Sequence, residues 1–325
     1  MVRKVAKNLK QSMGSGRKTA LIAAIHSFPA KHRPEQVFSD FVELAALSIS
    51  NAVDRSQFDA REKRYLEVVK GYASEDLARF PEMLGLLTIE LEERVTSNTL
   101  TDVLGETFMG LGLGNDRTGQ FFTPYHVSSL MAKLTINGSQ QAIEENGFLR
   151  LQEPACGAAG MVIAAAEAVR DAGYNYQKQM HATCIDIDAR CVHMAYLQLS
   201  LLGIPAIVVH GNALTEQVWS IWQTPMHVLG GWRGKLSKEL GREERRSLHR
   251  PGSPDDVVDV TAAAGAPCDV EAGSDKGAAP IVTERKVSVE SPNGSAADIA
   301  ALFEDVVRKV PRPMIFDVVE QMTLF

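Results

Sequence analysis

Residues 147–169 read GFLRLQEPACGAAGMVIAAAEAV, and this stretch decides the fold. The apolar run at 147–151 predicts a β-strand, and the small residues after Pro154 predict a tight turn. Residues 160–173 then predict a helix. A strand, a glycine-rich turn and a helix start let the backbone approach a bound nucleotide closely. We therefore expect a ligand site here, although a buried turn beside a capping acid has the same pattern.

Strand and helix patterns continue to alternate beyond this unit. HATCIDID (181–188) predicts a second strand, residues 189–204 a second helix, and AIVVHGN (206–212) a third strand. Alternation with short joints is typical of a parallel, doubly wound sheet. The binding crevice of such a sheet lies at the carboxyl ends of its strands.

Helical periodicity dominates the chain upstream of this sheet. Residues 35–113 carry apolar side chains at helical spacing throughout, beginning after Pro34. A further helix is expected after QFFTP (120–124), with Thr123 as its N-cap and Pro124 at its first position. The fold class is therefore α/β, a helical domain followed by a sheet domain.

Composition sets broad limits on the protein. The four cysteines among 325 residues form no CxxC pair, which favours a reduced, cytoplasmic protein without a metal site. No apolar run has the length of a membrane span, and no signal peptide is visible. Residues 1–34 carry eight Lys and Arg and no acid, against 26 basic and 40 acidic residues in the remainder. Such a basic arm suggests contact with a polyanion such as DNA, or is a solvated terminus.

Three polar features follow three successive strands: the turn Glu153–Gly160, Asp186 and Asn212. An acid after the second strand can accept hydrogen bonds from both hydroxyls of a ribose. A side-chain amide after the third can face an adenine edge. The turn has neither the G-x-G-x-x-G spacing of dinucleotide sites nor the lysine of a P-loop. A nucleoside without a pyrophosphate fits best, and S-adenosylmethionine (SAM) meets that description.

Four motifs in order carry a family resemblance: QFFTP (120–124), EPACGAAGM (153–161), CIDIDARCVHMAYLQLSLLGI (184–204) and HGNAL (210–214). Together they resemble the γ-class N6-adenine DNA methyltransferases, in particular the modification subunits of type I restriction systems and their phage and plasmid relatives. The resemblance covers roughly residues 35–215. It implies a helical domain before a Rossmann-like SAM-dependent methyltransferase domain.

The resemblance also implies roles for individual residues. The motif at 121–124 would wrap the methionine end of SAM, Glu153 would hold its ammonium group, and Asp186 would bind its ribose. Asn212 stands where the family usually has Asp, and Ala159 stands where it usually has Gly. A negative φ at Ala159 would tolerate that change; otherwise the turn is altered. The expected cofactor-binding residues are Phe121, Phe122, Thr123, Pro124, Glu153, Ala155, Cys156, Gly157, Gly160, Asp186, Ile187, Asn212 and Ala213.

The activity implied is methyl transfer from SAM to a flipped adenine in DNA. The family binds that base with a (D/N/S)PP(Y/F) loop, but this sequence contains no Pro-Pro dipeptide. Within WQTPMHVLGGW (222–232), where the loop should fall, Thr224, Pro225 and Trp232 are candidates for substitute contacts. We favour packing over the sheet edge for Trp219, Trp222 and Trp232, and the catalytic residues stay unassigned. The alternative is a catalytically inactive SAM-binding protein that acts as a DNA- or partner-binding factor.

The sheet ends early compared with the family. Either it is truncated, or residues 226–232, KVSVE (286–290) and PMIFDVV (313–319) complete it irregularly. DNA sequence reading would then come from a separate specificity subunit. The expected organisation is a basic arm (1–34), a helical domain (35–115), a SAM-binding domain (116–235), a flexible linker (236–296), and a C-terminal helix and tail (297–325).

The chain ends in QMTLF, comprising Gln321, Met322, Thr323, Leu324 and Phe325. This resembles the Q-L-x-L-F peptide with which bacterial proteins dock on the replication sliding clamp. Such a peptide works best on a flexible tether. A terminal strand or turn packed on the body of the protein is the other interpretation.

Overall fold

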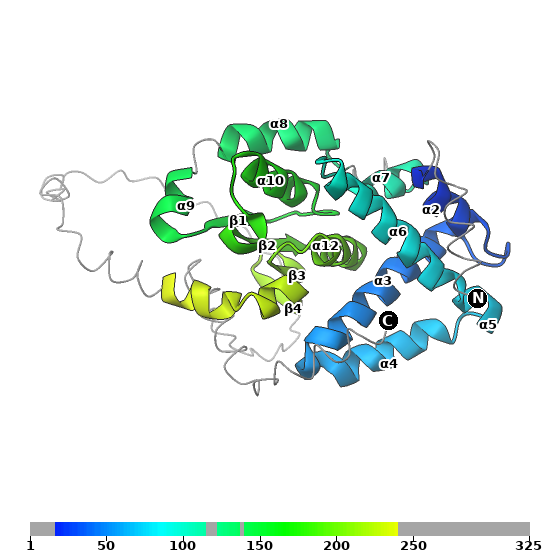
Figure 1. The fold of residues 1–325 in the computed structure, drawn as a ribbon. Helices are drawn as coiled ribbons and strands as arrows, with labels where there is room; N and C mark the ends of the chain where they lie inside the picture. The colour runs from blue at the N-terminus through cyan, green and yellow to red at the C-terminus, as the bar shows by residue number, and fades with distance from the viewer. Residues whose placement is uncertain (1–16, 115–121, 137–139, 240–325) are drawn as a thin grey trace, which may run out of the picture. The chain divides into compact units, whose positions relative to one another are not determined.

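The computed structural model describes residues 17–114, 122–136 and 140–239. The chain divides into two compact units, residues 1–239 with 309–325, and residues 240–308. All described residues belong to the first unit. The first unit is mixed α/β, rich in helix, with a small four-stranded sheet (Figure 1).

Helices alone form the first described segment. Apolar positions at helical spacing make these helices amphipathic, and on α3 the side chains of Val37, Phe38 and Phe41 are almost fully buried. Helix α2 falls within the residues expected to form the basic arm, yet it packs on α6 and α7 and buries Leu21 and Ile25. The helices are α2 (Arg17–His26), α3 (Pro34–Val53), α4 (Phe58–Val69), α5 (Ser74–Leu77), α6 (Arg79–Thr96) and α7 (Val103–Gly110), with the 3-10 helix η1 (Arg55–Gln57).

Strands and helices alternate in the remaining described residues, and the three strands and two helices predicted there are confirmed. The elements are α8 (Tyr125–Ile136), α9 (Gln140–Asn146), β1 (Leu149–Glu153), α10 (Gly160–Asp171), α11 (Tyr176–Gln179), β2 (Met180–Asp186), α12 (Ala189–Leu201), β3 (Ala206–Asn212), β4 (Gln217–Gln223) and α13 (Pro225–Leu229).

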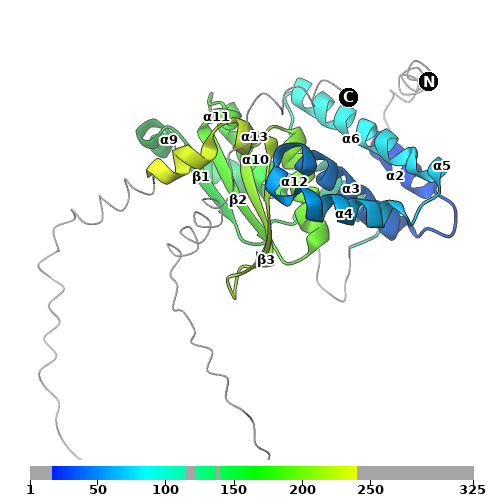
Figure 2. The same ribbon diagram turned by 90° about the horizontal axis from the view of Figure 1, so that it is seen from below.

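The sheet runs in the order β1-β2-β3-β4, and Figure 2 shows β1, β2 and β3 side by side. These three strands are parallel, with Glu153 opposite Cys184 and Asp186 opposite His210. The carboxyl ends of the three strands therefore lie at the same end of the sheet, in staggered positions. Glu153, Asp186 and Asn212 each occupy the last position of their strand, as the sequence predicted.

Strand β4 was not expected and runs antiparallel to β3. A turn at 213–216 returns the chain at once, so no crossover helix is needed. The expectation that residues 226–232 could add a strand is wrong. The Thr224 side chain accepts a hydrogen bond from the N–H of His227, and Pro225 occupies the first helical position, which starts α13 instead.

A buried arginine ties the helical segment to the outer edge of β4. Arg61 of α4 donates hydrogen bonds to the Ile221 carbonyl at 2.7 Å and to Asp54 at 2.9 Å. Its guanidinium also lies 4.2 Å from the ring centroid of Trp222. A single hydrophobic core runs through the helical segment and the sheet, with α3 against α12 (Figure 1).

Two histidines pair where β2 meets α13. His181 of β2 and His227 of α13 bring Nε2 and Nδ1 within 2.8 Å of each other, and Trp232 packs against His181. Burial first, and the neighbouring imidazole second, lowers the pKa of His181. Burial and Arg233 lower the pKa of His227 from 6.5 to about 4.

None of the described helices is long and apolar enough to cross a membrane.

The buried pair of His181 and His227 should make the protein less stable at mildly acidic pH. Because the folded pKa of His227 lies below its unfolded value, its contribution is present above pH 6.5 and is lost as pH falls toward 4. From pH 7 to pH 5 the loss from His227 alone should be about 2 kcal/mol of unfolding free energy. Urea unfolding at both pH values measures it. The double variant His181→Leu/His227→Leu should show a smaller pH dependence, and an equal dependence would contradict the assignment.

Candidate functional site

Two backbone donors hold the turn after β1 over the end of β2, and a third closes the turn on itself. The N–H of Cys156 donates to the Ile185 carbonyl at 2.9 Å, and the N–H of Gly157 donates to Oδ2 of Asp186 at 2.8 Å. The N–H of Ala159 closes the turn on the Cys156 carbonyl at 2.8 Å. Asp186 therefore connects the glycine-rich turn to the second strand.

Two residues of this turn have left-handed backbone. Gly157 has φ +53°, and a Cβ placed on it would lie 2.8 Å from the ring of Phe122. Ala159 has φ +70° and is fully buried at the N-cap of α10. The alanine therefore adopts the backbone that glycine favours, at a cost of roughly 1–2 kcal/mol. The negative φ that would tolerate alanine at this position is therefore not observed.

Replacing Gly157 by alanine should destabilise the protein and open this turn. The added Cβ meets the Phe122 ring as well as the unfavourable φ. Gly173→Ala is the matched control, because Gly173 has φ +87° and open space around it. In denaturant unfolding, Gly157→Ala should lower the free energy of unfolding by about 1–3 kcal/mol more than Gly173→Ala does. Equal losses in the two variants would show that Phe122 does not constrain the turn.

Two carboxyl groups line the ends of the first two strands. Glu153 and Asp186 are both half-buried, and burial raises the pKa of each. Backbone N–H groups of Ala155 and Asp188 oppose this shift by donating to Glu153 and Asp186 respectively. Neither acid forms an ion pair with a residue in the described ranges. Such acids are suited to a ligand that brings a cation or hydroxyl groups.

Asn212 shapes the end of the third strand. Its Oδ1 accepts hydrogen bonds from the N–H groups of Leu214 and Thr215, at 2.9 and 3.3 Å. Within the described part of the chain, its Nδ2 has no hydrogen-bond partner. Ile187, directly after Asp186, is 61% exposed, and Ala213 is partly exposed. A donor and an apolar side chain are thus available beside the two acids.

The motif at 121–124 lies next to the turn only in part. Phe121 is outside the described residues. The ring of Phe122 stands over Gly157 and packs on Phe108 with centroids 5.0 Å apart. Thr123 and Pro124 are exposed. Helix α8 begins at Tyr125, one residue later than expected, so Pro124 and not Thr123 directly precedes it. Phe122 is therefore the described residue of this motif that touches the turn.

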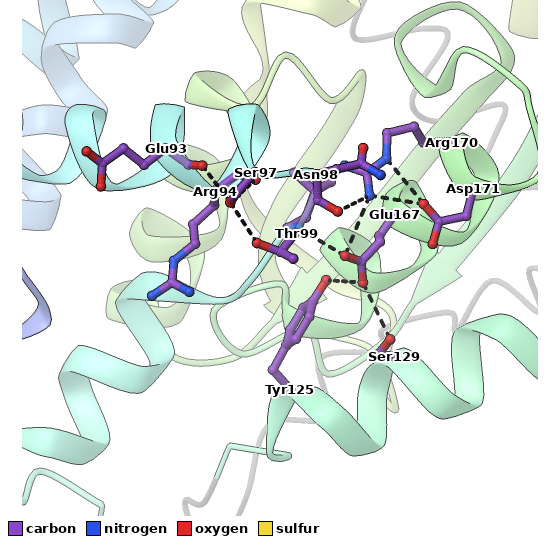
Figure 3. Close-up of polar contacts among 11 residues, drawn as sticks. Glu93, Arg94, Ser97, Asn98, Thr99, Tyr125, Ser129, Glu167, Arg170 and Asp171 are labelled. Atoms are coloured by element: carbon purple, nitrogen blue, oxygen red, sulfur yellow. Dashed lines mark hydrogen bonds and ion pairs between the residues drawn. The ribbon is translucent and has the colours of Figure 1, made fainter. Parts of the chain in front are cut away.

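Glu167 of α10 fixes α8 and the joint before α7 (Figure 3). Its Oε2 accepts hydrogen bonds from the Tyr125 hydroxyl at 3.1 Å and from the Ser129 hydroxyl at 3.4 Å. Its Oε1 accepts from the N–H of Leu100 at 3.0 Å. Burial, reinforced by this carboxylate, raises the pKa of Tyr125 and keeps its hydroxyl a donor. Arg170, on the same helix, donates to the Asn98 carbonyl at 2.8 Å.

Gln198 of α12 was missed in the sequence, although it is fully buried. Its Nε2 donates to the Ala158 carbonyl in the turn and to Oδ1 of Asp102, both at 2.8 Å. Its Oε1 accepts from the N–H of Leu104 at 3.0 Å. Asp102 in turn caps α7 by accepting from the N–H of Gly105. A glutamine on an otherwise apolar helix is the one sequence feature that could have indicated this role of Gln198.

A family model matches this region of the chain. Residues 112–230 match the model of the N-6 DNA methylase family. The match spans the turn, the three parallel strands and β4, and it supports an adenine-N6 DNA methyltransferase family for this part of the chain. None of the curated proteins compared with the chain matches it.

The candidates for substitute base contacts lie away from this N-6 DNA methylase-like site. Thr224 is fully buried, and its hydroxyl bonds the N–H of Ala206 and the carbonyl of Ile204 at the amino end of β3. Trp232 is also fully buried and packs on Phe148. The packing favoured for the tryptophans is confirmed for Trp222 and Trp232, whereas Trp219 is 50% exposed. Since Thr224 and Trp232 lie at the opposite end of the strand, they cannot replace a base-binding loop.

Proposed function

We propose that this protein is a SAM-dependent DNA adenine-N6 methyltransferase or the modification subunit of one. The observation that carries the proposal is Asp186. It holds the glycine-rich turn through the N–H of Gly157, beside a second half-buried acid, Glu153. The match of residues 112–230 to the N-6 DNA methylase family supports the same function.

The described residues fit SAM group by group. Glu153 would pair with the ammonium of the methionine part, and the N-terminus of α10, which has no side-chain cap from Ala159, would face its carboxylate. Asp186 would accept the ribose hydroxyls. Asn212 would donate from Nδ2 to the adenine, with Ile187 against the adenine ring. SAM supplies the activated methyl group, while these side chains bind and orient it.

A specific observation also favours the second candidate, a SAM-binding protein without transfer chemistry. No Pro-Pro dipeptide occurs in the sequence, and Thr224 and Trp232 are consumed by the core at the far end of β3. Neither Thr224 nor Trp232 therefore offers an acceptor that would activate an adenine amino group. In this case the pocket would serve DNA or partner binding.

Transfer of labelled methyl groups separates the two candidates. Purified full chain is incubated with methyl-labelled SAM and adenine-containing DNA, alone and with a candidate DNA-specificity subunit. Label in N6-methyladenine supports the methyltransferase. SAM binding without label in DNA under either condition supports the inactive form. Absence of SAM binding contradicts both.

We also propose that the C-terminal pentapeptide docks on the sliding clamp. Residues 321–325 lie outside the described residues, so the proposal rests on the sequence QMTLF. Deleting Gln321–Phe325 should abolish capture of the clamp in a pull-down, with Gln141→Leu as a surface control. Undiminished capture, or none by the full chain, would contradict clamp docking.

A further inference from the structure

We infer that the outward face of α8 is the contact between two copies of this chain, packed about a two-fold axis. Four large apolar side chains of α8 are between 37% and 71% exposed: Val127, Leu130, Met131 and Leu134. Their spacing of i, i+3, i+4 and i+7 places them on one face of the helix, which we call the α8 stripe. A contiguous exposed apolar surface of this kind marks a site of protein association.

Helix α8 turns small side chains toward the core and large apolar ones away from it. Ser128 and Ala132 are buried, together with Ile136 at the end of the helix, and the main neighbour of α8 is α10 (Figure 1). A helix that covers a core on one side ordinarily presents polar side chains on the other. The α8 stripe is apolar instead. Helix α8 therefore has the pattern of a helix with a neighbour on each side, and the described residues supply one of the two.

Leu66 of α4 shows the contrast with an ordinary surface residue. Its side chain is exposed as well, but its helix neighbours Lys63 and Lys70 are exposed and charged. A single apolar side chain among charged ones is common on protein surfaces. Leu66 therefore offers a matched control for the α8 stripe.

Hydrogen bonds hold the α8 stripe in a fixed position. The hydroxyls of Tyr125 and Ser129 donate to Oε2 of Glu167 on α10, at 3.1 and 3.4 Å (Figure 3). Both residues lie on the side of α8 opposite to the stripe, as helical spacing requires. A helix that is already fixed loses little conformational entropy when it docks, which favours association.

The spacing of the α8 stripe is self-complementary. In an antiparallel pair of these helices, Val127 lies opposite Leu134 of the second copy, and Leu130 lies opposite Met131 of the second copy. A half-turn about the point between Leu130 and Met131 thus returns the same pattern, which is the requirement for a two-fold interface. Antiparallel helices also set their dipoles against each other favourably.

Charge favours a second copy as the occupant over DNA. Helix α8 contains no acid, and its basic residues His126 and Lys133 lie beside the stripe. Binding of a polyanion needs several cations, and this face offers a single lysine. In the antiparallel pair, Lys133 lies level with Ser128 of the second copy, so the two lysines do not face each other. The stripe therefore suits an apolar face of equal length, and the second copy provides one.

The size of the α8 stripe points to a dimer that dissociates on dilution. A standard protein interface buries about 800 Å² on each partner, more than three turns of one helix supply. The stripe would therefore form the apolar centre of a small interface. The inference goes beyond the proposed function and does not depend on it.

Sedimentation velocity of the full chain tests the contact between about 1 μM and 1 mM, the range of weak complexes. The unmodified protein should shift from monomer to dimer across this range. Leu130→Glu would bury an unpaired carboxylate from each copy, so the dissociation constant should rise at least about 100-fold. Leu66→Glu makes the same change on α4 and should leave the dissociation constant within about threefold. Both variants should melt within a few degrees of the unmodified protein, which shows that they are folded.

Disulfide trapping tests the antiparallel register. The variants are made in a Cys268→Ser background, in which the remaining cysteines are buried. Leu130→Cys places the thiols of the two copies beside the two-fold axis, and mild oxidation should link them. Val127→Cys places its thiols about 10 Å apart along the helices, too far for a disulfide, and should stay unlinked.

Three results would overturn the inference. The first is a monomer at every concentration, whether another segment of this chain or a DNA-specificity subunit covers the α8 stripe. The second is equal weakening of the dimer by Leu130→Glu and Leu66→Glu. The third is linkage of Val127→Cys as readily as Leu130→Cys, the sign of parallel packing or random collision. None of these measurements involves SAM, so their failure is separate from failure of the proposed function.

Discussion

Replacing Gln198 by leucine is expected to lower the free energy of unfolding by about 3–5 kcal/mol, a range typical of broken buried networks. The leucine leaves the N–H of Leu104 and the carbonyl of Ala158 buried without their partner. Asp102 loses a donor at the same time. Urea unfolding at pH 7.5 measures the loss.

Ligand binding distinguishes positioning from simple stability in this variant. Because Gln198 holds the Ala158 carbonyl, its loss should loosen the turn that carries Gly157 and weaken SAM binding by the protein that remains folded. Gln141→Leu is the control, since Gln141 is exposed and its side chain donates to its helix neighbour Glu145 at 2.6 Å. Unchanged SAM affinity per folded molecule would show that Gln198 is purely structural. A free energy of unfolding within about 1 kcal/mol of that of the Gln141→Leu control would contradict the hydrogen-bond network around Gln198.

Asp186→Asn is expected to weaken SAM binding roughly 10- to 100-fold. Hydrogen bonds to a charged acceptor contribute about 1.5–3 kcal/mol each, and the asparagine keeps the shape but loses the charge. One amide oxygen can still accept from the N–H of Gly157, so the turn should stay folded. The shift in melting temperature with increasing SAM measures the affinity.

Asp59→Asn is the control for this variant, because Asp59 is an exposed acid on α4. It should bind SAM as the unmodified protein does. Asp186→Asn should also melt within a few degrees of the unmodified protein without SAM. A variant that keeps full affinity would remove Asp186 from the site, and the ribose contact with it.

Local sequence patterns predicted the features that depend on neighbouring residues. The strand ends at Glu153, Asp186 and Asn212 follow from apolar runs that stop at a polar residue. Parallel pairing follows from the helices between them, which are long enough to be crossovers. The three strand ends were therefore placed correctly at one end of the sheet, and a ligand site there stays a prediction.

Long-range contacts explain what the sequence did not predict. Strand β4 carries alternating residues, but its direction depends on the short turn after Asn212 and on the cover that Arg61 gives it from 160 residues away. Gln198 and Glu167 act through partners far along the chain, and no local pattern marks them. The left-handed φ of Ala159 follows from the turn around it.

Calorimetric titration of the full chain with SAM measures whether the strand ends bind this cofactor. The carboxyl ends of β1, β2 and β3 should bind one SAM per chain, with no comparable heat from NAD or ATP, because the turn has no site for a pyrophosphate. Binding should weaken as pH falls, since protonation of Glu153 and Asp186 begins at a higher pH than for ordinary carboxyls. No heat with SAM from correctly folded protein, or equal binding of NAD, would contradict the account.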